Sequence, residues 1–252
     1  MRFSPLLIAA LIAGPAAAQG VLNTGQAEDG WYVSGFVGAA FPSDAEFTGV
    51  QQPDPGIPSP AGNVAGVPAE IDIEFDTELY FGGAIGYKLP FTYLRYFQPR
   101  LEIEVSYLEK EVSGGSFNGG GQIFGGEQEI LFVLLNNYSD IRWSDTQTVV
   151  PYIGGGIGVG IVDSDVQYFP PSAAGPVFAV QGDSTGFAGT IAGGLTWELS
   201  EQLDVYAEGR YYRVSGVDLE RRFIGGGADI FNADVSDRLT GATATAGARF
   251  KF

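Results

Sequence analysis

Acidic and basic side chains recur at every second position along several segments of this 252-residue chain. Carboxylates and cations that share one face can pair, can relay a proton or an ion, or can act as acid and base in catalysis. The residues that form this candidate interior polar network are Glu74, Asp76, Glu78, Arg100, Glu102, Glu104, Asp204, Glu208, Arg210, Arg249 and Lys251. We favour a structural role, because buried charges must be paired. A conducting path gated by switching ion pairs is the alternative.

Catalysis is disfavoured by the residue types that the chain lacks. It contains no His and no Cys. His is the usual general base because its pKa lies near the working pH. Without it, catalysis would need a tuned carboxylate pair, and no spacing in the sequence singles one out. We therefore predict no enzyme, no catalytic residue and no cofactor-binding residue.

Net charge limits the partners that the protein can bind. The formal charge is −17, which argues against nucleic acid or anionic lipid because both would be repelled. Acidic loops could attract a divalent cation, but no loop has the fixed Asp spacing of a dedicated calcium motif. We therefore predict no metal ligands, and the extracellular ligand cannot be derived from the sequence.

The charged positions belong to segments in which polar and apolar residues alternate, which is the pattern of a β-strand with two different environments. Glu104, for example, follows Ile103 in one such segment. Turn-forming residues separate the segments. The sequence predicts an all-β chain with eight strands, at about 31–41, 71–88, 100–111, 128–140, 149–161, 185–199, 203–213 and 238–252.

The lengths of the connections alternate as well. Four long connections rich in Gly, Pro or Asp are predicted at 42–70, 112–127, 162–184 and 214–237. Shorter ones are predicted at 89–99, 141–148 and 200–202. Long loops at one end and short turns at the other are typical of outer-membrane barrels.

Alternation alone leaves two arrangements open, because a soluble barrel and a membrane barrel both alternate. Charges outside would give a secreted soluble barrel that binds a lipophile. Apolar residues outside would give a transmembrane barrel, which the loop lengths favour. Aromatic residues at strand ends favour it too, among them Trp31, Phe41, Tyr87 and Trp197. We therefore predict an eight-stranded antiparallel up-and-down transmembrane β-barrel with four long extracellular loops, short periplasmic turns and a filled polar interior. A narrow, low-conductance porin-like channel remains the alternative.

The first residues have the features of a secretory signal peptide. Arg2 is followed by an apolar core from Leu6 to Ile12, by Pro15, and by small residues that end at Ala18. We predict a signal peptide at 1–18, an N-terminal periplasmic segment at 19–30 and an outer-membrane barrel at 31–252 of a Gram-negative bacterium.

Four segments resemble the small outer-membrane barrels known as opacity-protein or OmpA-like surface antigens, which are also grouped as porin-family barrels. They are Gly30-Trp31-Tyr32-Val33-Ser34-Gly35, Phe81-Gly82-Gly83-Ala84-Ile85-Gly86-Tyr87, Pro151-Tyr152-Ile153-Gly154-Gly155-Gly156-Ile157-Gly158 and Ala246-Gly247-Ala248-Arg249-Phe250-Lys251-Phe252. The resemblance implies contact with outer-membrane lipid and delivery by the barrel-assembly machinery. That machinery reads the last strand, so Phe250 and Phe252 would form the assembly signal. The resemblance implies a structural or loop-mediated recognition role, but no single activity.

Overall fold

The computed structural model describes residues 29–53, 55–58, 65–144, 146–170 and 173–252. The predicted signal peptide at 1–18, and most of the predicted segment at 19–30, lie outside the described residues. Among the described residues, no helix is long and apolar enough to cross a membrane.

Strands make up almost all of the described chain. They are β1 (Gly30–Pro42), β2 (Ala45–Val50), β3 (Pro68–Phe75), β4 (Glu78–Lys88), β5 (Phe97–Phe117), β6 (Gly120–Gly121), β7 (Ile123–Ile141), β8 (Val149–Phe169), β9 (Phe178–Glu198), β10 (Leu203–Phe223) and β11 (Ile230–Lys251), with one short 3₁₀ turn, η2 (Gly225–Gly227). The six longest strands have 19 to 22 residues.

These strands close into an antiparallel ring. Within the described residues the ring contains eight strands, in the order β1, β4, β5, β7, β8, β9, β10 and β11, and β11 returns to β1 with Val33 opposite Phe250. Further along the axis, β2 and β3 take the places of β1 and β4, since β2 pairs with β11 and β3 pairs with β5. The prediction of an eight-stranded antiparallel ring is confirmed.

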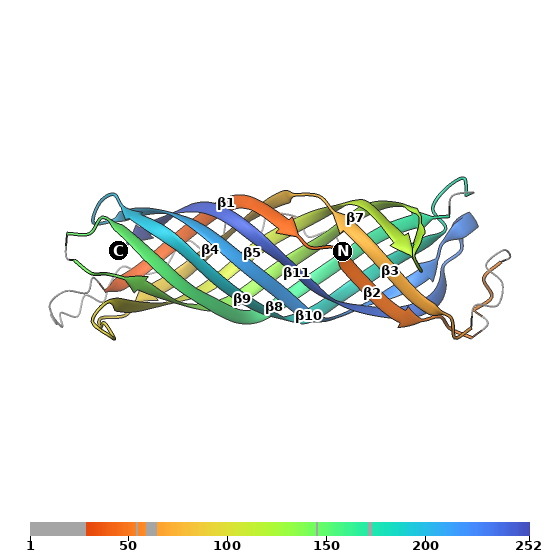
Figure 1. The fold of residues 1–252 in the computed structure, drawn as a ribbon, viewed down its shortest axis with the longest axis horizontal. Coiled ribbons are helices and arrows are strands. Elements are labelled where there is room, and N and C mark those ends of the chain that lie inside the picture. Colours follow the sequence, from red (N-terminus) through yellow and green to blue (C-terminus); the bar gives the residue numbers. More distant parts are fainter. Residues whose placement is uncertain (1–28, 54, 59–64, 145, 171–172) are drawn as a thin grey trace.

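Figure 1 shows an elongated barrel with the chain's C-terminus at one end and β2 and β3 near the other. We call the half that contains the short connections 89–96, 142–148 and 199–202 the turn-end half, and the opposite half the loop-end half. A strand of 21 residues extends roughly 70 Å at ~3.3 Å per residue. Crossing a membrane takes only about 9–11 residues per strand.

The predicted long loops are wrong in extent. Most of 162–184 and 214–237 belongs to β8, β9, β10 and β11, and β2 and β3 occupy parts of 42–70. Their content of Gly, Pro or Asp indicated loops. In the structure they belong to strands that continue well beyond the predicted ends, with acidic side chains such as Asp165, Asp183 and Glu220 on the outer face and Arg221 buried inside.

The predicted strand 71–88 is also wrong, because it is interrupted. β3 ends at Phe75 and β4 begins at Glu78, and the faces exchange across this break. Ile71 and Ile73 are completely buried, whereas Leu79 points outward and is exposed. The sequence pattern had placed these three side chains on one common face.

The two halves have opposite polarity. In the turn-end half the exposed outer side chains are apolar, with Ile103 at 58% and Ile191 at 67% exposure. In the loop-end half the outer positions carry Glu109, Glu111 and Asp165, while the interior is apolar. The interior side chains there include Phe47, Ile71, Ile73, Leu108, Ile130, Val162, Val180, Val214, Leu219 and Val235.

Five inward tyrosines each lie opposite a glycine on the neighbouring strand. The pairs are Tyr32 with Gly86, Tyr138 with Gly154, Tyr152 with Gly194, Tyr206 with Gly247, and Tyr212 with Gly241. A Cβ at Gly194 would lie 2.6 Å from the Tyr152 ring, so only glycine leaves room for the ring there. The glycines therefore let large rings fill the barrel without expanding it.

Candidate functional site

The inner wall of the turn-end half carries most of the predicted network. On β5, Arg100, Glu102 and Glu104 point inward and are buried, while Leu101 and Ile103 point outward. This separation follows from the two-residue period of a strand. The other predicted residues on this wall are Asp204, Glu208 and Arg210 on β10, and Arg249 and Lys251 on β11.

A central cluster forms around the carboxylate of Glu104. Arg210 binds it in a bidentate manner, with Nη1 donating to Oε1 at 2.6 Å and Nη2 donating to Oε2 at 2.7 Å. Ser106 Oγ donates to Oε1 at 2.9 Å, and Asn136 Nδ2 donates to Oε2 at 2.8 Å. Glu208 Oε1 lies 2.9 Å from Arg210 Nη2. Charge-assisted, bidentate contacts of this kind are strong and fix the geometry of both groups.

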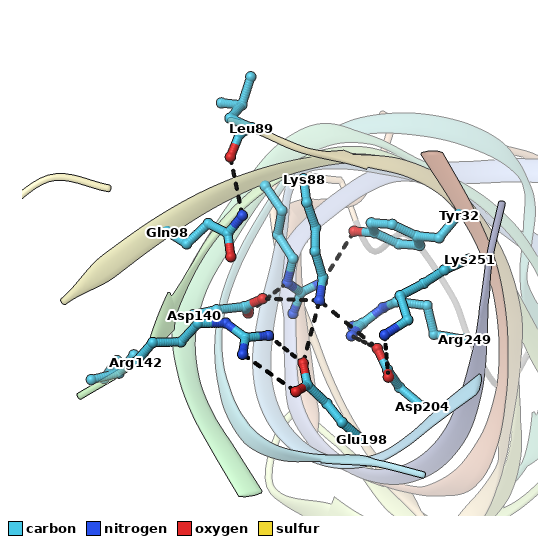
Figure 2. A network of polar contacts seen from close by, with 12 residues as sticks. Tyr32, Lys88, Leu89, Gln98, Asp140, Arg142, Glu198, Asp204, Arg249 and Lys251 are labelled. Carbon is cyan, nitrogen blue, oxygen red and sulfur yellow. Dashed lines mark hydrogen bonds and ion pairs between the residues drawn. The ribbon is translucent and has the colours of Figure 1, made fainter. Parts of the chain in front are cut away.

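A terminal cluster lies nearer the turns, where side chains of β4, β7, β9, β10 and β11 meet (Figure 2). Lys88 Nζ lies 3.8 to 3.9 Å from a carboxylate oxygen of each of Asp140, Glu198 and Asp204. On its other side, Asp204 pairs with Lys251 at 3.0 Å. Lys88 is therefore held by ion pairs, whereas Glu198 also accepts hydrogen bonds from Arg142. The residues that complete it are Arg142 and Arg249.

Arg100 joins the two clusters. Its Nε donates to Asp140 Oδ1 at 2.9 Å, and its Nη1 pairs with Glu102. Its guanidinium carbon also lies 4.2 Å from the ring centroid of Tyr138 and 4.6 Å from that of Tyr152. The planar cation therefore combines ion pairs with ring contacts in a space that excludes solvent.

Little room remains between the clusters. A cavity of about 10 Å³ lies there, enough for roughly one water molecule. Its lining consists of Phe36, Arg100, Glu102, Glu104, Tyr138, Tyr152, Tyr206, Glu208, Arg210 and Arg249. This part of the barrel interior is thus filled by side chains.

Three predicted network residues lie outside the network. Glu74 and Asp76 are exposed, because the break between β3 and β4 reverses the faces that the sequence pattern assigned. Glu78 shares the parity of Tyr80 and Lys88 on β4, but it is only half-buried and forms no ion pair with a described residue. Lys88, on the opposite side of β4 from Leu79, is buried within the network instead.

The network also contains residues that the sequence analysis did not select. Asp140, Arg142 and Glu198 lie at strand ends, outside the alternating runs of charge that drew attention to the others. Tyrosines were missed because only charged residues were considered. Their positions in the strands could have identified them, because Tyr80 and Tyr152 occupy inward-facing positions, as the charged residues of the network do.

With these corrections the charges balance. The inner-wall ion pairs of the described residues join six cations, namely Lys88, Arg100, Arg142, Arg210, Arg249 and Lys251, with six anions, namely Glu102, Glu104, Asp140, Glu198, Asp204 and Glu208. The network predicted from the sequence has seven acids and four bases, and the three acids in excess are Glu74, Asp76 and Glu78, which take no part in these ion pairs. Within the described parts of the chain, no group of three or more acidic side chains is arranged to hold a metal ion.

Comparisons with known proteins show the fold but no closer relationship. No family model and no curated protein matches the chain. Outer membrane protease OmpT from Escherichia coli is similar with a TM-score of 0.52 and 10% identity, over 88% of this chain and 97% of that one. OprG from Pseudomonas aeruginosa gives 0.43 and 16%, over 90% and 97%. Neisserial surface protein A gives 0.39 and 13%, over 89% and 99%. At these identities the likeness is one of fold, and the architecture is that of an outer-membrane β-barrel.

Proposed function

We propose that the turn-end half spans a bacterial outer membrane as a sealed barrel and that the loop-end half projects outside the cell. The observation that carries this proposal is the reversal of polarity along continuous strands. On β5 the outward residues change from Ile103, Val105 and Tyr107 to Glu109 and Glu111. Such a boundary is expected where a strand leaves lipid and enters water.

Aromatic side chains near the ends of the apolar belt support this placement. Trp31 and Tyr87 are neighbours near the turns, with ring centroids 5.2 Å apart. Phe41 lies exposed at the other end of β1. Amphipathic rings of this kind concentrate at the two membrane interfaces.

The filled interior supports a structural or recognition role over transport. The central cluster has fully occupied carboxylate oxygens and leaves a space of about 10 Å³, so a channel would require its ion pairs to separate. We also propose a non-catalytic role, supported by the absence of His from the sequence. The turn-end half argues against a soluble lipophile carrier, because its apolar side chains face outward around a charged interior.

Export and assembly complete the proposal. Residues 1–18 would direct export, and the barrel-assembly machinery would recognise the last strand. Phe250 and Phe252 are exposed on the outer face at the end of the chain, where such a signal would be accessible.

The test uses the folded protein purified from membranes. A barrel in detergent should migrate faster in an unheated gel than in a heated one, and it should float with lipid vesicles. In planar bilayers it should give no steady open state. A protein that stays folded without detergent and remains with the soluble fraction would contradict the membrane placement. A large, stable conductance would contradict only the sealed interior.

A further inference from the structure

One buried arginine in the described chain lacks the carboxylate partner that the others have. Arg221, on β10 in the loop-end half, is 1% exposed. Arg100, Arg210 and Arg249 each have a carboxylate oxygen within 4 Å. Arg221 forms no ion pair with any described residue. Removing a cation from water costs free energy that a counter-ion normally offsets, so this charge is incompletely compensated.

Aromatic rings pack against the Arg221 guanidinium. Its carbon lies 3.9 Å from the ring centroid of Phe178 and 4.3 Å from that of Phe117. Nε donates to the hydroxyl of Tyr168. Cation–π contacts stabilise the charge, but they leave the edge of the planar group available for hydrogen bonds.

The available edge is only weakly occupied. Nη1 of Arg221 reaches Oε1 of Gln51 at 3.4 Å, a long hydrogen bond. Nη2 donates to no described residue. A carboxylate binds such an edge through two parallel hydrogen bonds, and it supplies the missing charge.

Four parts of the chain meet around this group. Gln51 directly follows β2, Phe117 ends β5, Tyr168 lies next to the end of β8, and Phe178 begins β9. The Arg221 site, as we name these five residues, therefore lies where the strands end in the loop-end half. Side chains on a rigid scaffold at such a position are well placed for recognition.

We propose that the Arg221 site binds a small ligand with a single carboxylate on a flat apolar body, the carboxylate displacing the carboxamide oxygen of Gln51. The rings of Phe117, Tyr168 and Phe178 make the surroundings of the guanidinium apolar, which suits an apolar body. The net charge of −17, with exposed acids such as Glu220 and Asp234 on neighbouring strands, disfavours a polyanion. This proposal deepens the recognition role proposed above and rests on it.

The test is calorimetric titration of the detergent-folded protein with benzoate, using benzamide as the neutral counterpart. Benzoate should bind saturably with one site per chain, and benzamide should not compete. Arg221→Gln should weaken benzoate binding about tenfold or more, as expected for losing a charged hydrogen-bonding partner. Arg222→Gln is the matched control, because Arg222 is the neighbouring residue, lies at the surface and already pairs with Glu220 and Asp229. It should leave benzoate binding unchanged.

A second variant keeps the proposal testable if Arg221→Gln fails to fold. Gln51→Ala should bind benzoate at least as tightly as the unaltered chain, because it removes the group that the carboxylate displaces. Weaker binding by Gln51→Ala, or no saturable binding of benzoate, would overturn the proposal. Gel mobility and flotation with vesicles do not depend on Arg221, so a failure here is distinguishable from a failure of the membrane placement.

Discussion

The two halves of this barrel share their long strands, but the polarity of the inner and outer faces is opposite in the two halves. From Arg100 to Val112 every second residue of β5 faces inward, but Glu104 and Ser106 are succeeded on that face by Leu108. On the other face Ile103 is succeeded, further along, by Glu109. The loop-end half thus resembles a soluble barrel, with an apolar interior and a polar exterior. The turn-end half has the opposite arrangement, which is that of a membrane barrel. A single hydrogen-bonded scaffold accommodates both because backbone pairing does not depend on which face is polar.

Removing an interior carboxylate from the turn-end half should have the largest effect. Glu104→Leu leaves Arg210 buried with only Glu208 as a charged partner, so we expect a loss of ~3–5 kcal/mol in the free energy of unfolding. Urea unfolding in detergent micelles measures it. Glu109→Leu is the matched control, because Glu109 faces outward, and it should change stability by less than about 0.5 kcal/mol. Equal effects of the two substitutions would break the comparison.

Charges introduced on the outer face of β5 test where the apolar belt ends. Ile103→Arg places a cation in the proposed lipid belt and should cost ~2–4 kcal/mol. Glu109→Arg, six residues further along the same face, should be nearly neutral because that position is solvated. Unfolding in lipid vesicles would reveal the difference. A similar cost at both positions would mean that the lipid boundary does not lie between them.

The tyrosine–glycine pairs should be sensitive to a single methyl group. Gly194→Ala directs a Cβ to 2.2 Å from the carbonyl oxygen of Ala207 and 2.6 Å from the Tyr152 ring, so we expect a loss of ~1–3 kcal/mol. At Gly189, which lies on the same strand, an added Cβ meets nothing within 4 Å. Gly189→Ala should therefore be tolerated, and thermal unfolding of both variants would decide. A tolerated Gly194→Ala would show that the turn-end interior is looser than its contacts suggest.

The dry interior of the loop-end half should make stability depend on pH through Lys110. This residue is 1% exposed, and its Nζ lies 4.1 Å from the ring centroid of Phe75. Burial lowers the pKa of Lys110 from 10.5 to about 7, although Asp237 opposes the shift. Between these two values only the unfolded chain holds the proton, so the free energy of unfolding should rise with pH by about 1.4 kcal/mol per unit.

Below about pH 7 both states are protonated and this slope should vanish. Lys110→Met should remove the slope between about pH 7.5 and 9, which urea unfolding at several pH values would measure. If the unaltered chain and Lys110→Met showed the same slope, another group would be responsible for it.

Much of the fold was predictable because alternation reports strands directly. The eight strands and the inward position of Arg100, Glu104 and Arg210 followed from residue spacing alone. The sequence pattern did not predict where the inner face changes from polar to apolar and the outer face from apolar to polar. Polar and apolar residues alternate in the same way on either side of that point. The apolar run around Leu131 marks the crossover, where both faces are briefly apolar.

The site was harder to predict than the fold, for a different reason. Lys88, Asp140 and Glu198 converge from three separate strands, and their meeting depends on the stagger of the ring. No local pattern carries that information. The break at Asp76 and Thr77 likewise changes which residues point inward, although polar and apolar residues continue to alternate across it. For this reason Glu74 was wrongly predicted to point inward.

In the proposed membrane placement, the length of the strands sets how far the loop-end half reaches from the cell. On β5 about ten residues continue past the polarity boundary between Tyr107 and Glu109. At ~3.3 Å per residue and a tilt of roughly 40°, they would extend about 25 Å beyond the lipid. The loop-end half would then act as a rigid spacer. Side chains at its far end could contact soluble molecules and neighbouring cells without first approaching the lipid headgroups.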